Sequence, residues 1–358
     1  MKKFLQRIGL DNFILTLFGA IFLAWLYPQI GAKSGFFSLS TLANLGVSII
    51  FFFYGLRLNW EKIRVGLANI KMHIIVMTST FLLFPILILG TMSATGTMPT
   101  HKDVAALEMK TENLEMRQTC YNTSVEDSVV KTGLWLGVFF LATLPSTVSS
   151  SVVMTNIARG NVPAAIFDAS ISSLLGVFIT PLWMRLFIDA SCGGRNLGAV
   201  LFSLTAQVII PVCLGIYANR YWGEFSKRNN KKLRIYDQST IVLIVYVSFC
   251  NSFAKNMFAG LSWSLLAWLT LGMTTLFFIV FCLIFIICKV LYFNKKDTIA
   301  TLFCGSKKSL VHGAAMSRVI LNNAQMAGIL ILPTMIYHAM QLIVVSVIAQ
   351  KFAKQADE

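Results

Sequence analysis

Ten apolar segments, each about as long as a membrane-crossing helix, constrain this chain more than any other feature. A helix needs roughly 20 residues, mostly apolar, to cross about 30 Å of hydrocarbon. Only 13% of the 358 residues are charged, whereas a soluble domain carries about 25%. The pattern therefore predicts an all-α polytopic membrane protein with ten transmembrane helices. The predicted spans are residues 12–31, 39–58, 69–92, 132–157, 162–188, 197–220, 237–257, 261–292, 297–321 and 325–350.

The basic residues predict how these spans are oriented. The formal net charge is +15, a surplus that in a soluble protein would suggest a nucleic-acid partner. With the N-terminus inside, most Lys and Arg residues fall in cytoplasmic loops and tails, as the positive-inside rule requires. We therefore expect a multi-pass protein of the inner (plasma) membrane, with both termini in the cytoplasm and no nucleic-acid partner.

One polar segment, residues 93–131, separates the third and fourth spans and is predicted to be an extracytoplasmic insertion. It is longer than most loops of compact domains. The sequence leaves two interpretations open: a lid or partner-docking element, and a tolerated surface insertion. Cys120 in this segment and Cys192 in the next outer loop are predicted to share a side of the membrane, and whether they form a disulfide is also left open.

Two spans, the fourth and the ninth, contain sequences that interrupt a helix. Residues 144–151 combine Pro145 with a run of hydroxyl side chains, and residues 304–309 include two lysines. A packing kink and lysines that snorkel to the interface are one explanation. However, the interruptions match in position between two five-span halves, 1–188 and 189–358, which an odd number of spans orients oppositely. Paired broken helices in inverted repeats are typical of secondary transporters.

Four segments carry a family resemblance: residues 145–150 and 158–161 around the first interruption, 51–58 in the second span and 332–341 in the tenth. In this order they resemble the bile acid:sodium symporter family, solute carrier family 10; residues 332–341 resemble the branch that contains its seventh vertebrate member. The resemblance implies a panel domain and a core domain in which the discontinuous fourth and ninth helices cross. It also implies a bile-acid-like or other amphipathic carboxylate or sulphate as substrate, and two sodium ions at the crossing.

The positions that resemble the family's sodium ligands depart from its pattern. Ala165 and Ala169 have no side-chain oxygen, and Cys304 stands where the resemblance implies a glutamate shared by both ions. Sodium requires oxygen ligands, usually with a carboxylate that offsets its desolvation. The remaining positions of the implied site are Thr80, Ser150, Ser151 and Lys308.

Lys308 is a candidate substitute for a sodium ion, because a lysine ammonium is a compact cation of unit charge. We expect Ser150, Ser151 and helix C-terminal carbonyls to hold it. Asp168 is an acid deep in a predicted span. It is the expected counter-charge for Lys308 or Lys307, and such a pair could exchange a proton during transport. The alternative is that Asp168 is a neutral or hydrogen-bonded packing residue.

Six further polar residues are predicted to line a substrate cavity: Ser149, Lys307, Ser309, His312, Asn251 and His338. His73 is expected instead to anchor the third span at the membrane interface. The chain shows no paired-carboxylate site, P-loop or nucleophile elbow, so we do not expect an enzyme. The cysteines lack the spacing of zinc ligands, so we expect no metal site.

The leading hypothesis is a secondary active transporter that carries an organic anion by symport with sodium. The changed ion ligands favour an alternative, a sodium-independent or proton-coupled carrier in which Lys308 replaces a sodium ion. A third hypothesis is a membrane regulator or scaffold that keeps the fold without cycling, in which residues 93–131 bind a partner. The expected partners are the lipid bilayer and a small organic anion. The sequence implies no cofactor apart from sodium, and it leaves the substrate and the oligomeric state open.

Overall fold

The computed structural model describes residues 12–32, 38–57, 69–99, 123–188, 210–254, 262–321 and 327–354. Every regular element in these residues is helical, which confirms the predicted class. Within the described chain, six helices are long and apolar enough to cross a membrane. They are Leu39–Leu56, Ile70–Ala94, Val162–Phe187, Asn230–Ala254, Trp263–Val290 and Ala327–Lys354. The predicted total of ten spans stays a prediction.

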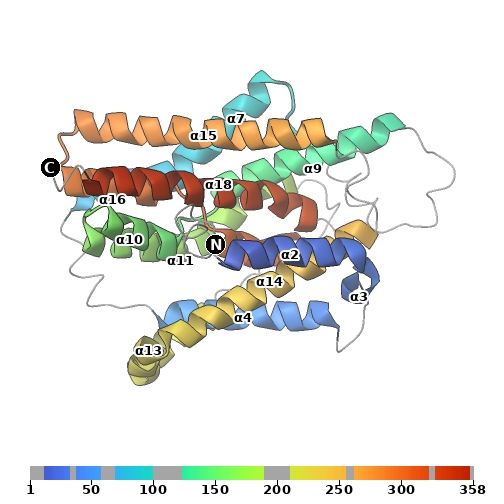
Figure 1. Cartoon of the computed structure of the whole chain (residues 1–358), viewed down its shortest axis with the longest axis horizontal. Helices are drawn as coiled ribbons and strands as arrows, with labels where there is room; N and C mark the ends of the chain where they lie inside the picture. Colours follow the sequence, from blue (N-terminus) through green and yellow to red (C-terminus); the bar gives the residue numbers. More distant parts are fainter. Residues whose placement is uncertain are drawn as a thin grey trace.

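The described helices follow one another as an all-helical bundle (Figure 1). In chain order they are α2 (Asn12–Leu26), α3 (Pro28–Ala32), α4 (Leu39–Leu56), α6 (Ile70–Thr78), the π-helical turn η1 (Ser79–Leu83), α7 (Phe84–Ala94), α9 (Thr123–Thr143), α10 (Val148–Ile157), α11 (Val162–Ile188), α13 (Ile210–Arg228), α14 (Asn230–Ala254), α15 (Trp263–Val290), α16 (Lys295–Gly305), α17 (Leu310–Leu321) and α18 (Ala327–Lys354).

The helices pack as two groups. In the α4–α14 group, α4 packs against α13 and α14, and α14 also packs against α2 and α3. The broken-helix group holds α6, η1, α7, α9, α10, α11, α15, α16, α17 and α18, and α14 touches it through α17 and α18. In Figure 1 the α4–α14 group forms the lower part of the molecule. Each group draws helices from both predicted halves of the chain; the repeat boundaries themselves stay predictions.

Two glycines allow α4 and α13 to approach closely. A Cβ atom at Gly55 would meet the carbonyl oxygen of Val212, and one at Gly215 would meet the carbonyl oxygen of Phe52. Small residues at such a contact let helix backbones pack in an apolar environment where no hydrophobic force drives them together. This close packing makes α4 and α13 one unit within their group.

The chain leaves helical geometry at the two places that the sequence predicts. The first break lies between α9, which ends at Thr143, and α10, which begins at Val148. The second break lies between α16, which ends at Gly305, and α17, which begins at Leu310. Both breaks are buried, so their backbone groups need partners from within the protein.

The predicted insertion 93–131 is shorter in the structure. The helix α7 continues to Ala94, and α9 begins at Thr123, nine residues before the predicted start of the fourth span at residue 132. The predicted boundary was late because the polar first turns of α9 lack the apolar signal of a span. Cys120, Cys192 and residues 197–209 of the sixth predicted span lie outside the described residues.

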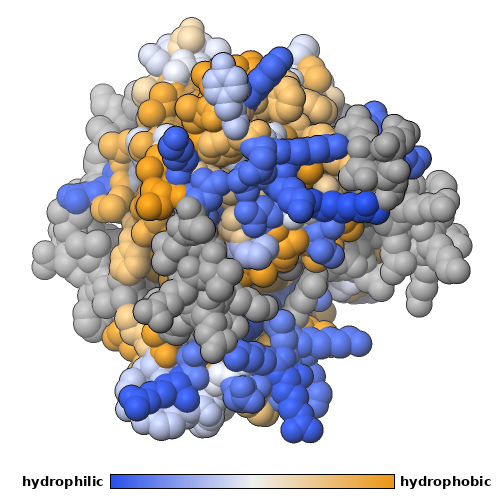
Figure 2. All heavy atoms as spheres, turned by 90° about the vertical axis from the view of Figure 1, so that its left-hand side faces the viewer, coloured by the Kyte–Doolittle hydropathy of each residue, from blue (hydrophilic) through white to orange (hydrophobic). Residues whose placement is uncertain are grey.

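Figure 2 views the molecule from the end at which α13 passes into α14 and α15 into α16. Hydrophilic side chains gather at this end, and apolar side chains cover much of the flanks (Figure 2). The exposed residues at these two junctions include Lys227, Lys232, Lys295 and Lys296. The sequence assigns these lysines to the cytoplasm, and the orientation itself stays a prediction.

Candidate functional site

The two breaks contact each other inside the broken-helix group. The backbone N–H of Ser309 donates to the carbonyl oxygen of Pro145 (2.9 Å). The Ser151 hydroxyl donates to the carbonyl oxygen of Phe303 (3.0 Å). Residues 144–151 and 304–309, far apart in the chain, therefore form one irregular, buried region.

Lys308 begins at the second break and reaches the first with its side chain. Its Nζ donates hydrogen bonds to the carbonyl oxygens of Thr80 (2.7 Å), Ala142 (2.7 Å) and Leu144 (2.9 Å). The ammonium also lies 4.1 Å from the centroid of the Phe84 ring, where a cation interacts favourably with the π face. The side chain is fully buried, and its three N–H donors all have acceptors.

Two prolines explain why these carbonyls are available. The helix α9 ends at Thr143, before Pro145, so the carbonyls of Ala142 and Leu144 lie at its end. The N–H of Ser146, which would bond to Ala142 if the helix continued, donates to the Ser172 hydroxyl instead (2.9 Å). In η1 the N–H of Phe84 bonds to the carbonyl of Ser79. The next residue, Pro85, has no N–H for the carbonyl of Thr80. The local sequence thus leaves three carbonyls without helical donors, and their oxygens converge on one ammonium.

Nζ of Lys308 therefore bonds to three backbone carbonyls, and neither predicted serine hydroxyl is among its acceptors. The Ser151 hydroxyl donates to the carbonyl oxygen of Phe303 instead. The backbone carbonyl of Ser150 accepts from Nζ of Lys307 (2.9 Å). Sequence position alone placed the serines near the cation, but the rotation of α10 directs them to other partners.

The second break is held by neutral side chains of α18. The Tyr337 hydroxyl donates to the carbonyl oxygen of Ser306 (2.7 Å). The Gln341 side chain accepts from the N–H of Lys308 (2.9 Å) and donates to its carbonyl oxygen (2.8 Å). Both side chains are fully buried. The backbone of this break thus finds its partners without any charged group.

A cavity of about 730 Å³ lies between the two helix groups. The α4–α14 group contributes Tyr54, Arg57 and Asp237 to its lining, and Arg57 forms an ion pair with Asp237. The broken-helix group contributes Ser150 and His312. The Tyr54 and His312 rings lie 4.7 Å apart between their centroids, so the two groups also touch at the cavity wall.

The amino ends of two helices open onto this cavity. Thr147 and Val148 at the start of α10 line it, as do Ser309 and Val311 at the start of α17. The N–H groups of a first helical turn lack intrahelical partners, and the helix dipole makes this end positive. The cavity therefore offers two positive helix ends, a site that favours a negative group.

The predicted cavity residues are only partly in its lining. Those that line it are Ser309, His312 and His338. Asn251 does not: its amide donates to a carbonyl of its own helix (2.7 Å). Lys307 is not in the lining either: its Nζ donates to the backbone carbonyl of Ser150, which is a lining residue. The side chain of Ser149 lies outside the described part of the chain.

Asp168 is not the counter-charge of a lysine, so that prediction was wrong. Its Oδ1 lies 2.8 Å from Nδ1 of His73. His73 is buried, so its predicted role as an interfacial anchor was also wrong. Within the described residues no ion pair joins Lys307 or Lys308 to an acid. Cys304, at the position of the implied glutamate, donates its thiol to the carbonyl of Ala165 (3.7 Å).

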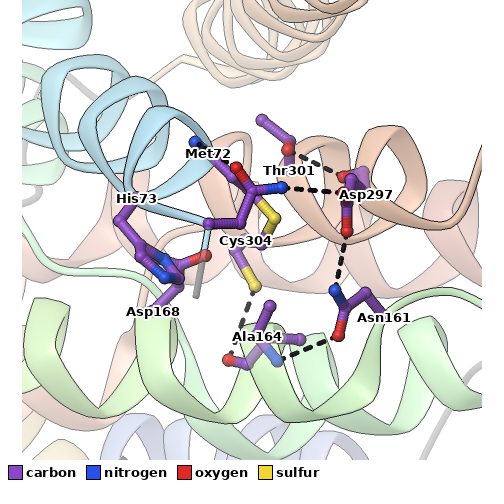
Figure 3. A network of polar contacts seen from close by, with 10 residues as sticks. Met72, His73, Asn161, Ala164, Asp168, Asp297, Thr301 and Cys304 are labelled. Carbon is purple, nitrogen blue, oxygen red and sulfur yellow. Dashed lines mark hydrogen bonds and ion pairs between the residues drawn. The ribbon is translucent and has the colours of Figure 1, made fainter. Parts of the chain in front are cut away.

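A second polar cluster was missed by the sequence reasoning. The carboxylate of Asp297 accepts hydrogen bonds from the side-chain amides of Asn69 (2.7 Å), Asn161 (2.6 Å) and Asn294 (2.7 Å). Each asparagine oxygen in turn caps the start of a helix: α6, α11 and α16. Figure 3 shows Asp297 beside Asn161, with His73, Asp168 and Cys304 nearby. The asparagines before three apolar runs were a capping signal that could have been found.

Comparisons with known proteins agree with this architecture. The SBF-like CPA transporter family matches residues 11–354. An uncharacterized protein of Pseudomonas aeruginosa is 33% identical over 97% of this chain and 94% of its own length. The "Putative symporter YfeH" of Escherichia coli is 32% identical, over 98% and 95%. The rat "Sodium/bile acid cotransporter 7" is 26% identical, over 97% and 93%. The chain belongs to the SBF-like CPA transporter family and is a multi-pass membrane protein.

Proposed function

We propose that the chain is a secondary transporter of an organic anion in which the ammonium of Lys308 takes the place of a coupling sodium ion. The observation that supports this most is the set of three carbonyl oxygens around Nζ of Lys308. Carbonyl oxygens of this kind would otherwise suit a small hard cation. A fixed ammonium makes a sodium ion at the same place both unnecessary and electrostatically unfavourable.

The residues around Lys308 also disfavour the binding of a second cation beside its ammonium. The residues at the neighbouring ion positions, Ala165, Ala169 and Cys304, are fully buried and supply no carboxylate. Burying an ion without an opposite charge is costly. Sodium coupling, which the names of several relatives include, is therefore the less favoured alternative for this chain.

An anionic substrate fits the cavity between the two helix groups. The helix ends of α10 and α17 and the guanidinium of Arg57 are the positive features of its lining. Apolar residues such as Phe51, Leu174 and Leu342 supply the rest of the wall. This combination favours an amphipathic carboxylate or sulphate, and the name of the rat relative makes bile acids the first probes to try.

The proposed transport cycle moves one helix group against the other. The cavity lies at their boundary, where the contacts include the Tyr54–His312 and Phe51–His312 ring pairs and the packing of α14 on α17 and α18. The predicted ten-helix inverted repeat, with halves 1–188 and 189–358 and cytoplasmic termini, is part of this proposal. Such repeats alternate a central site between the two sides of a membrane.

Uptake of tritiated taurocholate into proteoliposomes tests the proposal. We expect the same uptake rate when external NaCl is replaced by KCl. A strict sodium requirement would instead establish sodium symport. Absence of both uptake and binding for taurocholate and a sulphated steroid would support a non-cycling regulator and overturn the proposal.

A second measurement does not depend on the substrate. A ligand that binds only the folded state raises its stability in proportion to the logarithm of its concentration. We expect no sodium-specific rise of the unfolding temperature in the wild-type protein, compared with potassium. The variant Lys308→Ala is expected to gain such a rise, because its carbonyls are then free for the ion.

A further inference from the structure

The fixed position of Lys308 raises the question of what drives transport. An ammonium on a side chain stays with the protein throughout a cycle, so it cannot carry the energy of an ion gradient across the membrane. A dissociable ion must do so if the substrate is to be accumulated. The inference that follows rests on the proposed function, in which sodium does not fill this role.

We propose that His73 and Asp168 form a proton-binding site that couples transport to a proton gradient. Oδ1 of Asp168 lies 2.8 Å from Nδ1 of His73, joining α11 to α6. Asp168 is fully buried, and its Oδ2 has no hydrogen-bond partner among the described residues. The His73 ring also stacks on Phe167, with centroids 4.3 Å apart. The pair thus combines a titratable base, a titratable acid and an unused acceptor atom.

The charge of the pair changes by one unit when a single proton binds. Without it, an ionised Asp168 beside a neutral His73 carries a net charge of −1. With one proton on either group, the pair is neutral as a whole. Histidine is the side chain that ordinarily changes charge between about pH 5 and 8, and a buried net charge is unfavourable. Proton binding therefore removes a buried charge.

Few other ionisable groups face this pair. On α16, Cys304 is close enough to interact electrostatically with Asp168 and with Lys307, whereas the carboxylate of Asp297 accepts hydrogen bonds from three amides. On α6 the neighbouring Lys71 is exposed. The helix α10 carries no ionisable side chain, and His312 of α17 faces the cavity.

A short path connects the pair to the substrate cavity. Cys304 is close enough to both Asp168 and Lys307 for their charges to act on its thiol. Nζ of Lys307 donates to the carbonyl of Ser150 (2.9 Å), and Ser150 lines the cavity at the first turn of α10. A negative charge at Asp168 repels an anion in the cavity through a medium of low dielectric constant. A proton at the pair is therefore expected to strengthen anion binding. The proton enters with the substrate from one side of the membrane and leaves with the substrate on the other. No covalent bond to carbon changes.

Infrared spectroscopy tests the site without a substrate. Protein in phosphatidylcholine–phosphatidylglycerol liposomes is titrated between about pH 5 and 8, and two kinds of band are followed: the carbonyl band of a protonated carboxyl and the ring bands of imidazole. We expect Asp168→Asn to remove one titrating band and His73→Gln to shift its midpoint, whereas Asp168→Glu retains a band. The matched control, Asp237→Asn, alters another buried acid and is expected to leave this band in place. A spectrum with no band sensitive to Asp168→Asn would overturn the proposal.

A transport measurement separates this inference from the proposed function. In proteoliposomes free of sodium, an acid exterior is expected to drive accumulation of tritiated taurocholate. Asp168→Asn and His73→Gln are expected to lose this accumulation and to retain exchange of labelled for unlabelled taurocholate. If the uptake rate of the wild-type protein depends on neither sodium nor pH, the proposed proton site is wrong and the proposed sodium-independent carrier is retained. If uptake requires sodium, the proposed function fails first.

Discussion

The buried backbone groups of the two helix breaks find their hydrogen-bond partners in different ways. At the first break, the carbonyls of Ala142 and Leu144 accept from a lysine that comes from more than 160 positions away in the chain. At the second, Tyr337 and Gln341 supply neutral donors and acceptors. Hydrogen bonds to charged groups are roughly twice as strong as neutral ones. The first break therefore depends on one charge, whereas the second is satisfied by three separate neutral bonds.

The largest effect is expected from Lys308→Met. The thioether fills similar space and leaves three buried carbonyls without a donor, at roughly 1–3 kcal/mol for each unsatisfied group. We expect loss of taurocholate uptake and a clear fall in the unfolding temperature, measured by differential scanning fluorimetry. The loss should exceed that of any neutral substitution at the second break.

Lys307→Met is the matched control for this experiment. Nζ of Lys307 donates to the carbonyl oxygen of Ser150 and lies 5.7 Å from the Phe303 ring centroid. We expect a smaller fall in unfolding temperature than for Lys308→Met. Equal losses in the two variants would contradict the special role of the three carbonyls.

Glycine substitutions are expected to have the next largest effect, because the added Cβ atoms press on two neighbouring residues of the first break. A Cβ at Gly176 would lie 2.6 Å from Cγ of Pro145, inside the first break. A Cβ at Gly313, after the second break, would meet the flexible end of Leu144 at 2.8 Å. We therefore expect Gly176→Ala to reduce uptake and stability more than Gly313→Ala. The reverse order would show that the first break tolerates a Cβ against Pro145 better than one against Leu144.

Gln341→Leu tests the neutral break directly. It removes two buried hydrogen bonds to the backbone of Lys308. Each bond contributes about 1 kcal/mol net, and more when its partner stays buried and unsatisfied. We expect a moderate fall in unfolding temperature and reduced uptake, because the backbone that positions Lys308 loosens. Gln341→Glu retains an acceptor and is expected to be less damaging to folding in acidic medium than in alkaline medium.

The positions of the breaks could be predicted because their causes are local. Pro145 lacks an N–H, and consecutive lysines in an apolar span require a polar environment, so both signals stand in the sequence itself. The helical class likewise follows from composition and segment length. The start of α9 could not be predicted well, since its first turns are polar and resemble the loop before it.

The partners of the side chains could not be predicted because they depend on helix rotation. Asp168 and His73 belong to different helices, and only their relative rotation brings Oδ1 and Nδ1 to 2.8 Å. Asn251 was assigned to the cavity on polarity alone, although an amide can bond to its own helix. The acceptors of Lys308 are backbone oxygens, which carry no residue-type signal at all.

The smallest effects are expected from removing one neutral hydroxyl at each break. The Thr180 hydroxyl donates to the carbonyl of Thr143 (2.8 Å) at the first break, and the Tyr337 hydroxyl donates to Ser306 (2.7 Å) at the second. Thr180→Val and Tyr337→Phe each remove one such bond with little change in volume, at about 1 kcal/mol. If Lys308 dominates the first break, Thr180→Val should add little in a Lys308→Met background, and Tyr337→Phe should add its full effect. Double-variant cycles of unfolding temperature measure this difference. Equal additivity at both breaks would mean that the ammonium and its neutral neighbours act independently.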